Sequence, residues 1–234
     1  MATRAQTITV ALAVTPLFVA GGCTATPSKS AAASASTAAT TSAVAPSCLA
    51  KATAMSRAQQ AGQVVMVGVT GKLDSAEAAA IKKYRIGSVI LMGNYTGGVA
   101  QVKKVTAAIR RVGGRQVLIA TDQEGGAVRR LRGKGYPTLA AAATQAGWSD
   151  ATLRSKTRKL AQAMASSGVR MDLAPVADVV PKSNRSANRP VARLHRGYGS
   201  SPAKVSAKVT AFRDGMTAGR VATAVKHFPG LGAV

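Results

Sequence analysis

Five short apolar runs recur along the chain beyond residue 60, and each is rich in Val, Ile, Leu or Met. The runs are Val64–Val69, Ser88–Gly93, Val117–Thr121, Met171–Val176 and Val221–Val225. Apolar positions that are continuous rather than alternating are typical of strands buried on both faces, as in a parallel sheet. The pattern therefore predicts five buried, parallel strands.

Between these runs the apolar positions repeat at helical spacing. Asp74 and Glu77 form a capping-box pattern at the start of a predicted helix from Ser75 to Tyr84. Asp150 is expected to cap the third helix, and Ser201, followed by proline, to begin the fourth. The apolar stripes of the other three helices run over Val102–Val112, Leu153–Met164 and Val205–Met216.

Regular alternation of strands and helices predicts an α/β fold. An open doubly wound sheet and a TIM barrel both fit this pattern. The first strand is not followed by a Gly-x-Gly-x-x-Gly turn, and the sequence has no Walker loop, which disfavours the nucleotide-binding open sheets. Polar residues gather where strands end, as in a barrel. We expect an incomplete TIM (β/α)8 barrel with about five βα units over residues 48–234.

The first 47 residues have a different composition. Arg4 precedes an apolar stretch from Ile8 to Ala20 that is too short to span a membrane, so residues 1–22 are predicted to be an export signal. Small residues followed by Cys23 resemble the lipobox of bacterial lipoproteins, with simple cleavage as the alternative. Residues 23–47 are mostly Ala, Ser and Thr and are predicted to form a disordered tether. We expect an exported lipoprotein, anchored through Cys23 on the outer face of the cytoplasmic membrane in the cell envelope.

The chain is strongly basic, with 32 Lys and Arg against 8 Asp and Glu and a formal net charge of +24. Nucleic acid is disfavoured as a partner because the basic residues are dispersed, aromatic residues make up only 3% and no recognition motif occurs. An anionic envelope polymer or a membrane surface fits this charge, and a solvated basic surface is the plainer alternative.

Candidate ligand-binding side chains follow three of the predicted strands. Asp122 comes directly after the third strand, before the flexible pair Gly125-Gly126. Asp172 and Asp178 lie in and after the fourth strand, and the Lys226-His227 pair follows the fifth. Taken alone, a carboxylate of this kind can cap a turn or pair with an arginine, and a histidine can be structural.

Several segments together resemble the N-terminal barrel domain of glycoside hydrolase family 3, and in particular its bacterial β-N-acetylhexosaminidase branch. They occur in the family's order from about residue 55 onward. The segments are Gly62–Gly68, Ile86–Leu91, Asp122–Leu131, Leu173–Val179 and Lys226–Gly230.

The resemblance implies a saccharide site on the upper rim of the barrel and hydrolysis of terminal β-linked N-acetylglucosamine, in peptidoglycan fragments or related saccharides, by a retaining mechanism. It implies neither a cofactor nor a metal ion. The residues that match the family's sugar-binding positions are Asp122, Arg130, Arg196, Lys226 and His227. For Asp122 a turn cap, and for Arg196 a structural ion pair, remain alternatives.

Two positions depart from the family pattern: Leu231 replaces the histidine of Lys-His-Phe-Pro-Gly-His-Gly, and His195 stands where many relatives carry aspartate. The resemblance also implies that the family's acid/base Asp-His pair and its nucleophilic aspartate belong to later regions. We therefore expect no catalytic residue in this chain and no activity from it alone. The alternative is a non-catalytic, saccharide-binding envelope lipoprotein.

Overall fold

Five parallel strands form the central sheet of the protein. The structure, a computed structural model, describes residues 47–231. The predicted signal, Cys23 and nearly all of the predicted tether therefore lie outside the described residues. In the sheet the strands lie side by side in chain order: β1 (Met66–Thr70), β2 (Ser88–Met92), β3 (Leu118–Thr121), β6 (Met171–Asp172) and β7 (Ala222–Thr223).

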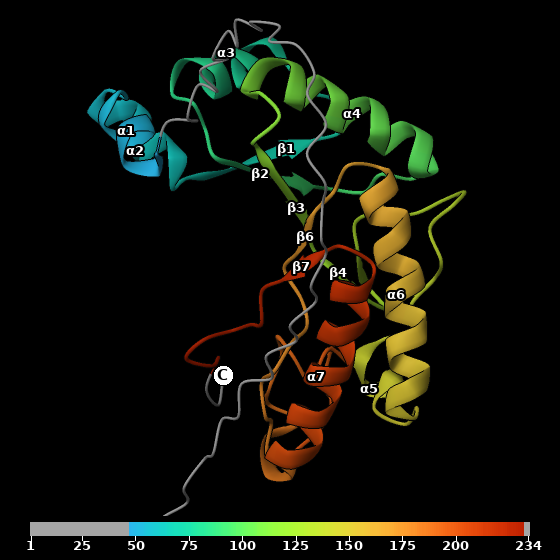
Figure 1. Cartoon of the computed structure of the whole chain (residues 1–234). Coiled ribbons are helices and arrows are strands. Elements are labelled where there is room, and N and C mark those ends of the chain that lie inside the picture. Colours follow the sequence, from blue (N-terminus) through green and yellow to red (C-terminus); the bar gives the residue numbers. More distant parts are fainter. Residues whose placement is uncertain (1–46, 232–234) are drawn as a thin grey trace, which may run out of the picture. The chain divides into compact units, whose positions relative to one another are not determined.

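Four helices connect these strands and form a layer along the sheet (Figure 1). Each of them packs against the next: α3 contacts α4, α4 contacts α6, and α6 contacts α7. Parallel strands in chain order with each helix returning on the same side are the geometry of consecutive units of a (β/α)8 barrel. The predicted α/β class is thus confirmed. The bounds are α3 (Ser75–Lys83), α4 (Gly98–Gly113), α6 (Asp150–Ser166) and α7 (Pro202–Ala218).

The two faces of the sheet differ in burial. Val69 and Leu91 are paired across β1 and β2, and both are fully buried in the cluster that includes helix residues such as Ile109. Gly68 and Met92, one residue out of phase, are exposed. Because successive side chains of a strand point to opposite faces, the helix-covered face carries the packed core.

Local signals account for where the helices begin. Asp74 and Glu77 form the predicted capping box of α3, and the Ser201 side chain caps α7 with Pro202 at its first position. The expected cap of α6 was wrong by one residue: the Ser149 hydroxyl accepts the N–H of Thr152, and Asp150 is the first helical residue. A serine at the cap leaves the Asp150 carboxylate free to accept a hydrogen bond from Lys208.

All five predicted strands are shorter in the structure, most of all the fourth and the fifth, which have two residues each. Helix α2 (Arg57–Gln63) extends to the start of the first run, so Val64 and Val65 are exposed and β1 begins at Met66. The fourth strand stops at Asp172, three residues before Pro175, which has no N–H for a ladder hydrogen bond.

The remaining elements were not predicted as helices or strands. The segment after Asp122 forms a small antiparallel hairpin from β4 (Gln123–Gly125) and β5 (Val128–Arg129). The others are α1 (Cys48–Thr53), α5 (Ala142–Gln145) and the 3-10 turn η1 (Lys182–Asn184). Within residues 47–231 no helix combines the length and apolar character needed to cross a bilayer.

Candidate saccharide site

The hairpin after β3 places two carboxylates at the end of the sheet. Asp122 follows the last residue of β3, and Glu124 lies in β4. Gly125 and Gly126 have φ angles of 103° and 56°, a conformation that strongly favours glycine. A side chain on Gly125 would also collide with the carbonyl oxygen of Ala140. The two glycines therefore allow the tight turn that directs Glu124 inward.

The segment after β7 brings a lysine and a histidine to the same end. Its backbone is held by Lys226, whose N–H donates to the Pro175 carbonyl at 3.1 Å and whose carbonyl accepts the N–H of Ala177 at 2.6 Å. These bonds extend the β6–β7 pairing beyond the strands. The side chains of Lys226 and His227 consequently reach the groups that follow β3 and β6.

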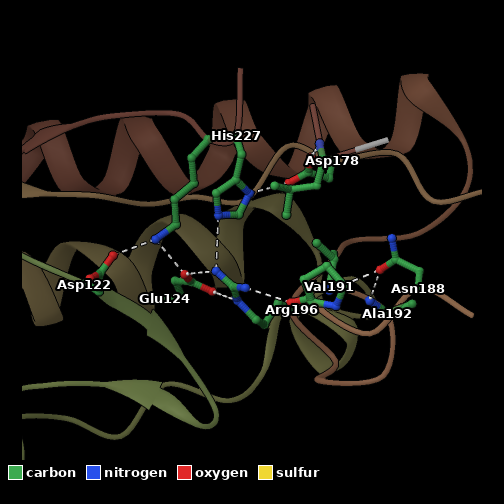
Figure 2. Close-up of polar contacts among 11 residues, drawn as sticks. Asp122, Glu124, Asp178, Asn188, Val191, Ala192, Arg196 and His227 are labelled. Atoms are coloured by element: carbon green, nitrogen blue, oxygen red, sulfur yellow. Dashed lines mark hydrogen bonds and ion pairs between the residues drawn. The ribbon is translucent and has the colours of Figure 1, made fainter. Parts of the chain in front are cut away.

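Lys226 and Arg196 bind the two carboxylates in one network (Figure 2). The Lys226 Nζ lies 2.6 Å from Asp122 Oδ1 and 2.7 Å from Glu124 Oε1. The Arg196 guanidinium is bidentate on Glu124, with Nε and Nη2 at 2.9 and 2.8 Å from its two oxygens. Only 4% of the Glu124 side chain is exposed. Glu124 is therefore the common partner of both cations.

His227 joins this network to a third carboxylate. Its Nδ1 lies 2.6 Å from Asp178 Oδ2, and its Nε2 lies 3.3 Å from Arg196 Nη2 (Figure 2). A guanidinium can only donate, so Nε2 accepts and Nδ1 carries the proton given to Asp178. Asp178 also accepts the N–H of Leu231 at 3.1 Å, which ties the segment after β7 to the loop after β6. Asp178 thus fixes the orientation of the imidazole ring.

The electrostatics keep the network charged. Burial raises the pKa of Glu124, but the hydrogen bonds from Arg196 and Lys226 outweigh this effect and hold that pKa below its ordinary value. The hydrogen bond to Glu124 raises the pKa of Arg196 in turn. Near neutral pH the site is therefore a preformed set of charged donors and acceptors.

A cavity of about 710 Å³ adjoins the network. Asp178, Lys226 and His227 form part of its wall, together with apolar residues such as Val225 and Phe228. A concave site with a few convergent polar groups on apolar walls is the usual form of a small-molecule site. Its volume lies within the usual range for such sites.

Most of the chain matches a known protein family. Residues 56–234 match the N terminal domain of glycosyl hydrolase family 3. The chain belongs to this family. A curated β-hexosaminidase of Xanthomonas oryzae is 31% identical over 181 residues, which are 73% of this chain and 51% of that protein. The chain therefore spans about half the length of the curated relatives it matches.

Solved structures of the family have the same fold. The β-N-acetylhexosaminidase of Beutenbergia cavernae superposes with a TM-score of 0.70 at 38% identity, over 76% of this chain and 55% of that one. NagZ of Neisseria gonorrhoeae, solved in complex with N-trifluoroacetyl-D-glucosamine, gives 0.61 at 26% identity over 72% of this chain and 50% of that one. The predicted TIM-barrel-like class is confirmed by these likenesses.

Four of the five site residues expected from the family resemblance lie together. Asp122, Arg196, Lys226 and His227 all belong to the network described above. Arg196 does form the ion pair that was its alternative, and it does so inside the site. Whether these residues contact sugar stays a prediction.

Arg130 is placed beside the network but not in it. Its backbone N–H donates to the Asp122 carbonyl at 3.2 Å, so the two residues are neighbours. Its side-chain Nε is buried and has no hydrogen-bond partner within the described residues. A buried donor without a partner is unusual in proteins.

Two members of the network are not among the five residues that the family resemblance implied. Glu124 was not singled out, and Asp178 was considered only as a carboxylate after the fourth strand. The sequence offered a weak signal, since Glu124 follows Asp122 by two residues and Asp178 follows β6. His195 lies outside the network: its φ of 57° and its carbonyl, which accepts the N–H of Ala143, give it a turn role.

Asp172 is fully buried below the network. One of its oxygens accepts the N–H of Gln123 at 2.8 Å, and the other has no partner within the described residues. Burial raises the pKa of Asp172 to about 8, so its carboxyl is largely protonated at neutral pH. Between residues 47 and 231 no group of three or more His, Cys, Asp or Glu side chains is placed to hold a metal ion.

Proposed function

We propose that this chain forms the sugar-binding part of a family 3 β-N-acetylhexosaminidase, which hydrolyses terminal β-linked N-acetylglucosamine in cell-wall or related saccharides by a retaining mechanism. The single observation that carries the proposal is the network of Asp122, Glu124, Arg196, Lys226 and His227 beside an open cavity. The names of the related proteins support the choice of N-acetylglucosamine.

The network suits a ligand rich in hydroxyl groups. The carboxylate oxygens of Asp122 accept hydrogen bonds, while Lys226 and Arg196 donate them, and hydrogen bonds to charged groups are the stronger ones. The Nε2 of His227 can accept a hydrogen bond from a sugar hydroxyl that displaces its contact with Arg196.

Retaining hydrolysis needs a nucleophilic carboxylate and a separate acid/base group. Within the described residues the carboxylates of the site already have partners: Asp122 and Glu124 pair with cations, and Asp178 pairs with His227. We accordingly assign these residues to sugar binding and to neither catalytic role. The same observation favours the second candidate, a non-catalytic, saccharide-binding lipoprotein.

Hydrolysis and binding assays distinguish the two candidates. We expect the full chain to bind N-acetylglucosamine in calorimetric titration and Lys226→Ala to weaken this binding at least tenfold, because Lys226 bridges two carboxylates. Lys204→Ala, an exposed change in the first turn of α7, is the matched control. Turnover of a chromogenic N-acetyl-β-glucosaminide by the chain would rule out the non-catalytic candidate. Absence of saturable binding to the sugar would contradict both.

We also propose that the protein is exported and anchored in the envelope through a lipid on Cys23. This proposal rests on the apolar stretch before Cys23 and the small residues next to it. Radiolabelled fatty acid should be incorporated into the wild-type chain in a bacterial host but not into Cys23→Ser. Equal labelling of both would contradict the anchor, and Cys48→Ser is the matched control for a second cysteine.

A further inference from the structure

Exposed arginines gather at the end of the sheet opposite the saccharide site. Arg85, Arg115, Arg170 and Arg220 are all exposed, and each lies one to three residues before a strand, respectively β2, β3, β6 and β7. The half-buried Arg110, near the end of α4, adds a fifth. We call these five residues the arginine rim.

The strand register determines how these arginines are spaced. The four strands are consecutive neighbours in the sheet, and parallel neighbours lie about 4.8 Å apart. The four arginines that precede these strands therefore lie in a row along one edge of the sheet. Arg110, Arg115 and Arg170 also line one open cavity of about 460 Å³ with Gln116, Val117 and Leu118.

Within residues 47–231, the guanidinium groups of the rim donate hydrogen bonds to backbone carbonyls alone. Arg110 Nη2 donates to the Gly168 carbonyl at 2.7 Å, and Arg170 Nη1 donates to the Arg220 carbonyl at 3.4 Å. Burial, together with the nearby charge of Arg170, lowers the pKa of Arg110. Two guanidinium groups are thus close enough to repel each other across this cavity.

None of the Asp and Glu side chains neutralises the rim. All eight Asp and Glu residues of the sequence lie within the described residues, and each of them is engaged elsewhere. Asp74 and Glu77 cap α3, Asp150 pairs with Lys208, and Asp214 with Arg213. The other four belong to the saccharide site or lie buried below it, and they are Asp122, Glu124, Asp172 and Asp178.

We propose that the arginine rim is a binding site for a multiply charged, phosphate-bearing anion. Guanidinium groups match phosphate geometry with paired hydrogen bonds, and an uncompensated row of them along one edge fits repeated or clustered phosphates better than a single small anion. The chemistry is shared by phosphodiester polymers and by phospholipid headgroups. The site is separate from the saccharide site, because it lies at the opposite ends of the same strands.

Titration of the full chain with inorganic tripolyphosphate tests the rim. We expect saturable binding that weakens as salt is raised, and at least a tenfold loss in Arg115→Gln/Arg170→Gln. The matched control, Arg154→Gln/Lys204→Gln, removes two exposed positive charges near the starts of α6 and α7, at the other end of the helices. The affinity of this control variant for tripolyphosphate should fall by no more than twofold.

Two results would overturn the proposal: no saturable binding by the wild-type chain, or equal losses in the two double variants, which would mean a diffuse response to net charge. Circular dichroism and urea unfolding establish that the variants fold. If the double variant fails to fold, the single variant Arg115→Gln replaces it. We then expect its affinity for tripolyphosphate to fall at least threefold, and that of the control Lys204→Gln to fall no more than 1.5-fold.

Vesicles identify the source of the phosphate. Phosphatidylcholine vesicles with and without one quarter phosphatidylglycerol are compared, so that any contribution of the apolar N-terminal stretch cancels. If phosphatidylglycerol strengthens vesicle binding by wild type but not by Arg115→Gln/Arg170→Gln, the rim binds lipid headgroups. Rim-dependent binding of tripolyphosphate without such a gain assigns it to a soluble phosphate polymer.

Discussion

Replacing Glu124 by glutamine tests the central claim about the site, namely that one buried carboxylate holds two cations in place. The change keeps the shape of the side chain and removes its charge. Arg196 and Lys226 would then stay 16% and 17% exposed without their shared partner, although Lys226 keeps Asp122. Breaking a buried ion pair from one side costs about 3–5 kcal/mol. Since Lys226 retains one partner, we expect a loss of about 2–4 kcal/mol.

Urea unfolding followed by circular dichroism measures this loss. With an m value of about 2 kcal/mol per molar urea, the unfolding midpoint should fall by about 1–2 M. Asp214→Asn is the matched control, because it removes the same charge from an exposed pair with Arg213, and we expect a loss below about 1 kcal/mol.

The pH dependence gives a second, independent readout. The pKa of Glu124 is lower in the folded state than its ordinary value, so its stabilising contribution is complete above about pH 4.3 and is lost as the pH falls through the lowered pKa. The difference in the free energy of unfolding between wild type and Glu124→Gln should therefore be largest near pH 7 and become smaller below about pH 4. Two results would refute the claim that Glu124 holds both cations: a difference in the free energy of unfolding no larger than that of Asp214→Asn, or a difference that is unchanged at pH 3.

Three further predictions concern the neighbouring structure. Burial raises the pKa of Asp172 to about 8, so ionisation of Asp172 destabilises the folded state progressively as the pH rises from about 4 to 8, by up to about 1.4 kcal/mol per pH unit. The urea midpoint of Asp172→Asn should therefore rise relative to that of wild type over this pH range. A difference between the two midpoints that does not change with pH would contradict the raised pKa. Asp178→Asn should weaken N-acetylglucosamine binding about tenfold, or about 1.4 kcal/mol, because an amide has one acceptor oxygen and cannot accept both the His227 Nδ1–H and the Leu231 N–H. Calorimetric titration with Asp214→Asn as control checks this, and unchanged affinity would remove Asp178 from the site. Gly215→Ala should destabilise the protein by about 1–3 kcal/mol, because its Cβ would collide with Thr157 Oγ1 and the Arg154 carbonyl where α7 crosses α6; thermal unfolding should show no comparable loss for the exposed Gly147→Ala, and a stabilised Gly215→Ala would contradict the close approach.

Local pattern was sufficient to predict most of the fold. The core positions of β2, β3, α4 and α7 follow from apolar spacing, because burial of one face is what makes each element stable. The errors have local causes. Val64 and Val65 are apolar but follow α2 and stay exposed, and the fourth strand ends near a proline. The hairpin β4–β5 was missed because its residues carry no alternating pattern, and it is held instead by the Gln123 side chain on Leu131.

The amino-acid sequence by itself determined the α/β class, the order of the elements and, through the family resemblance, the positions where polar residues follow strands. Only the tertiary structure decided which of those residues meet. Glu124 and Arg196 are 72 residues apart, and Asp122 and Lys226 are 104 apart, yet both pairs are in contact. The physical reason is that a parallel sheet brings the ends of distant strands to one edge, where the partner of a buried charge is chosen by distance in space and not by separation along the chain.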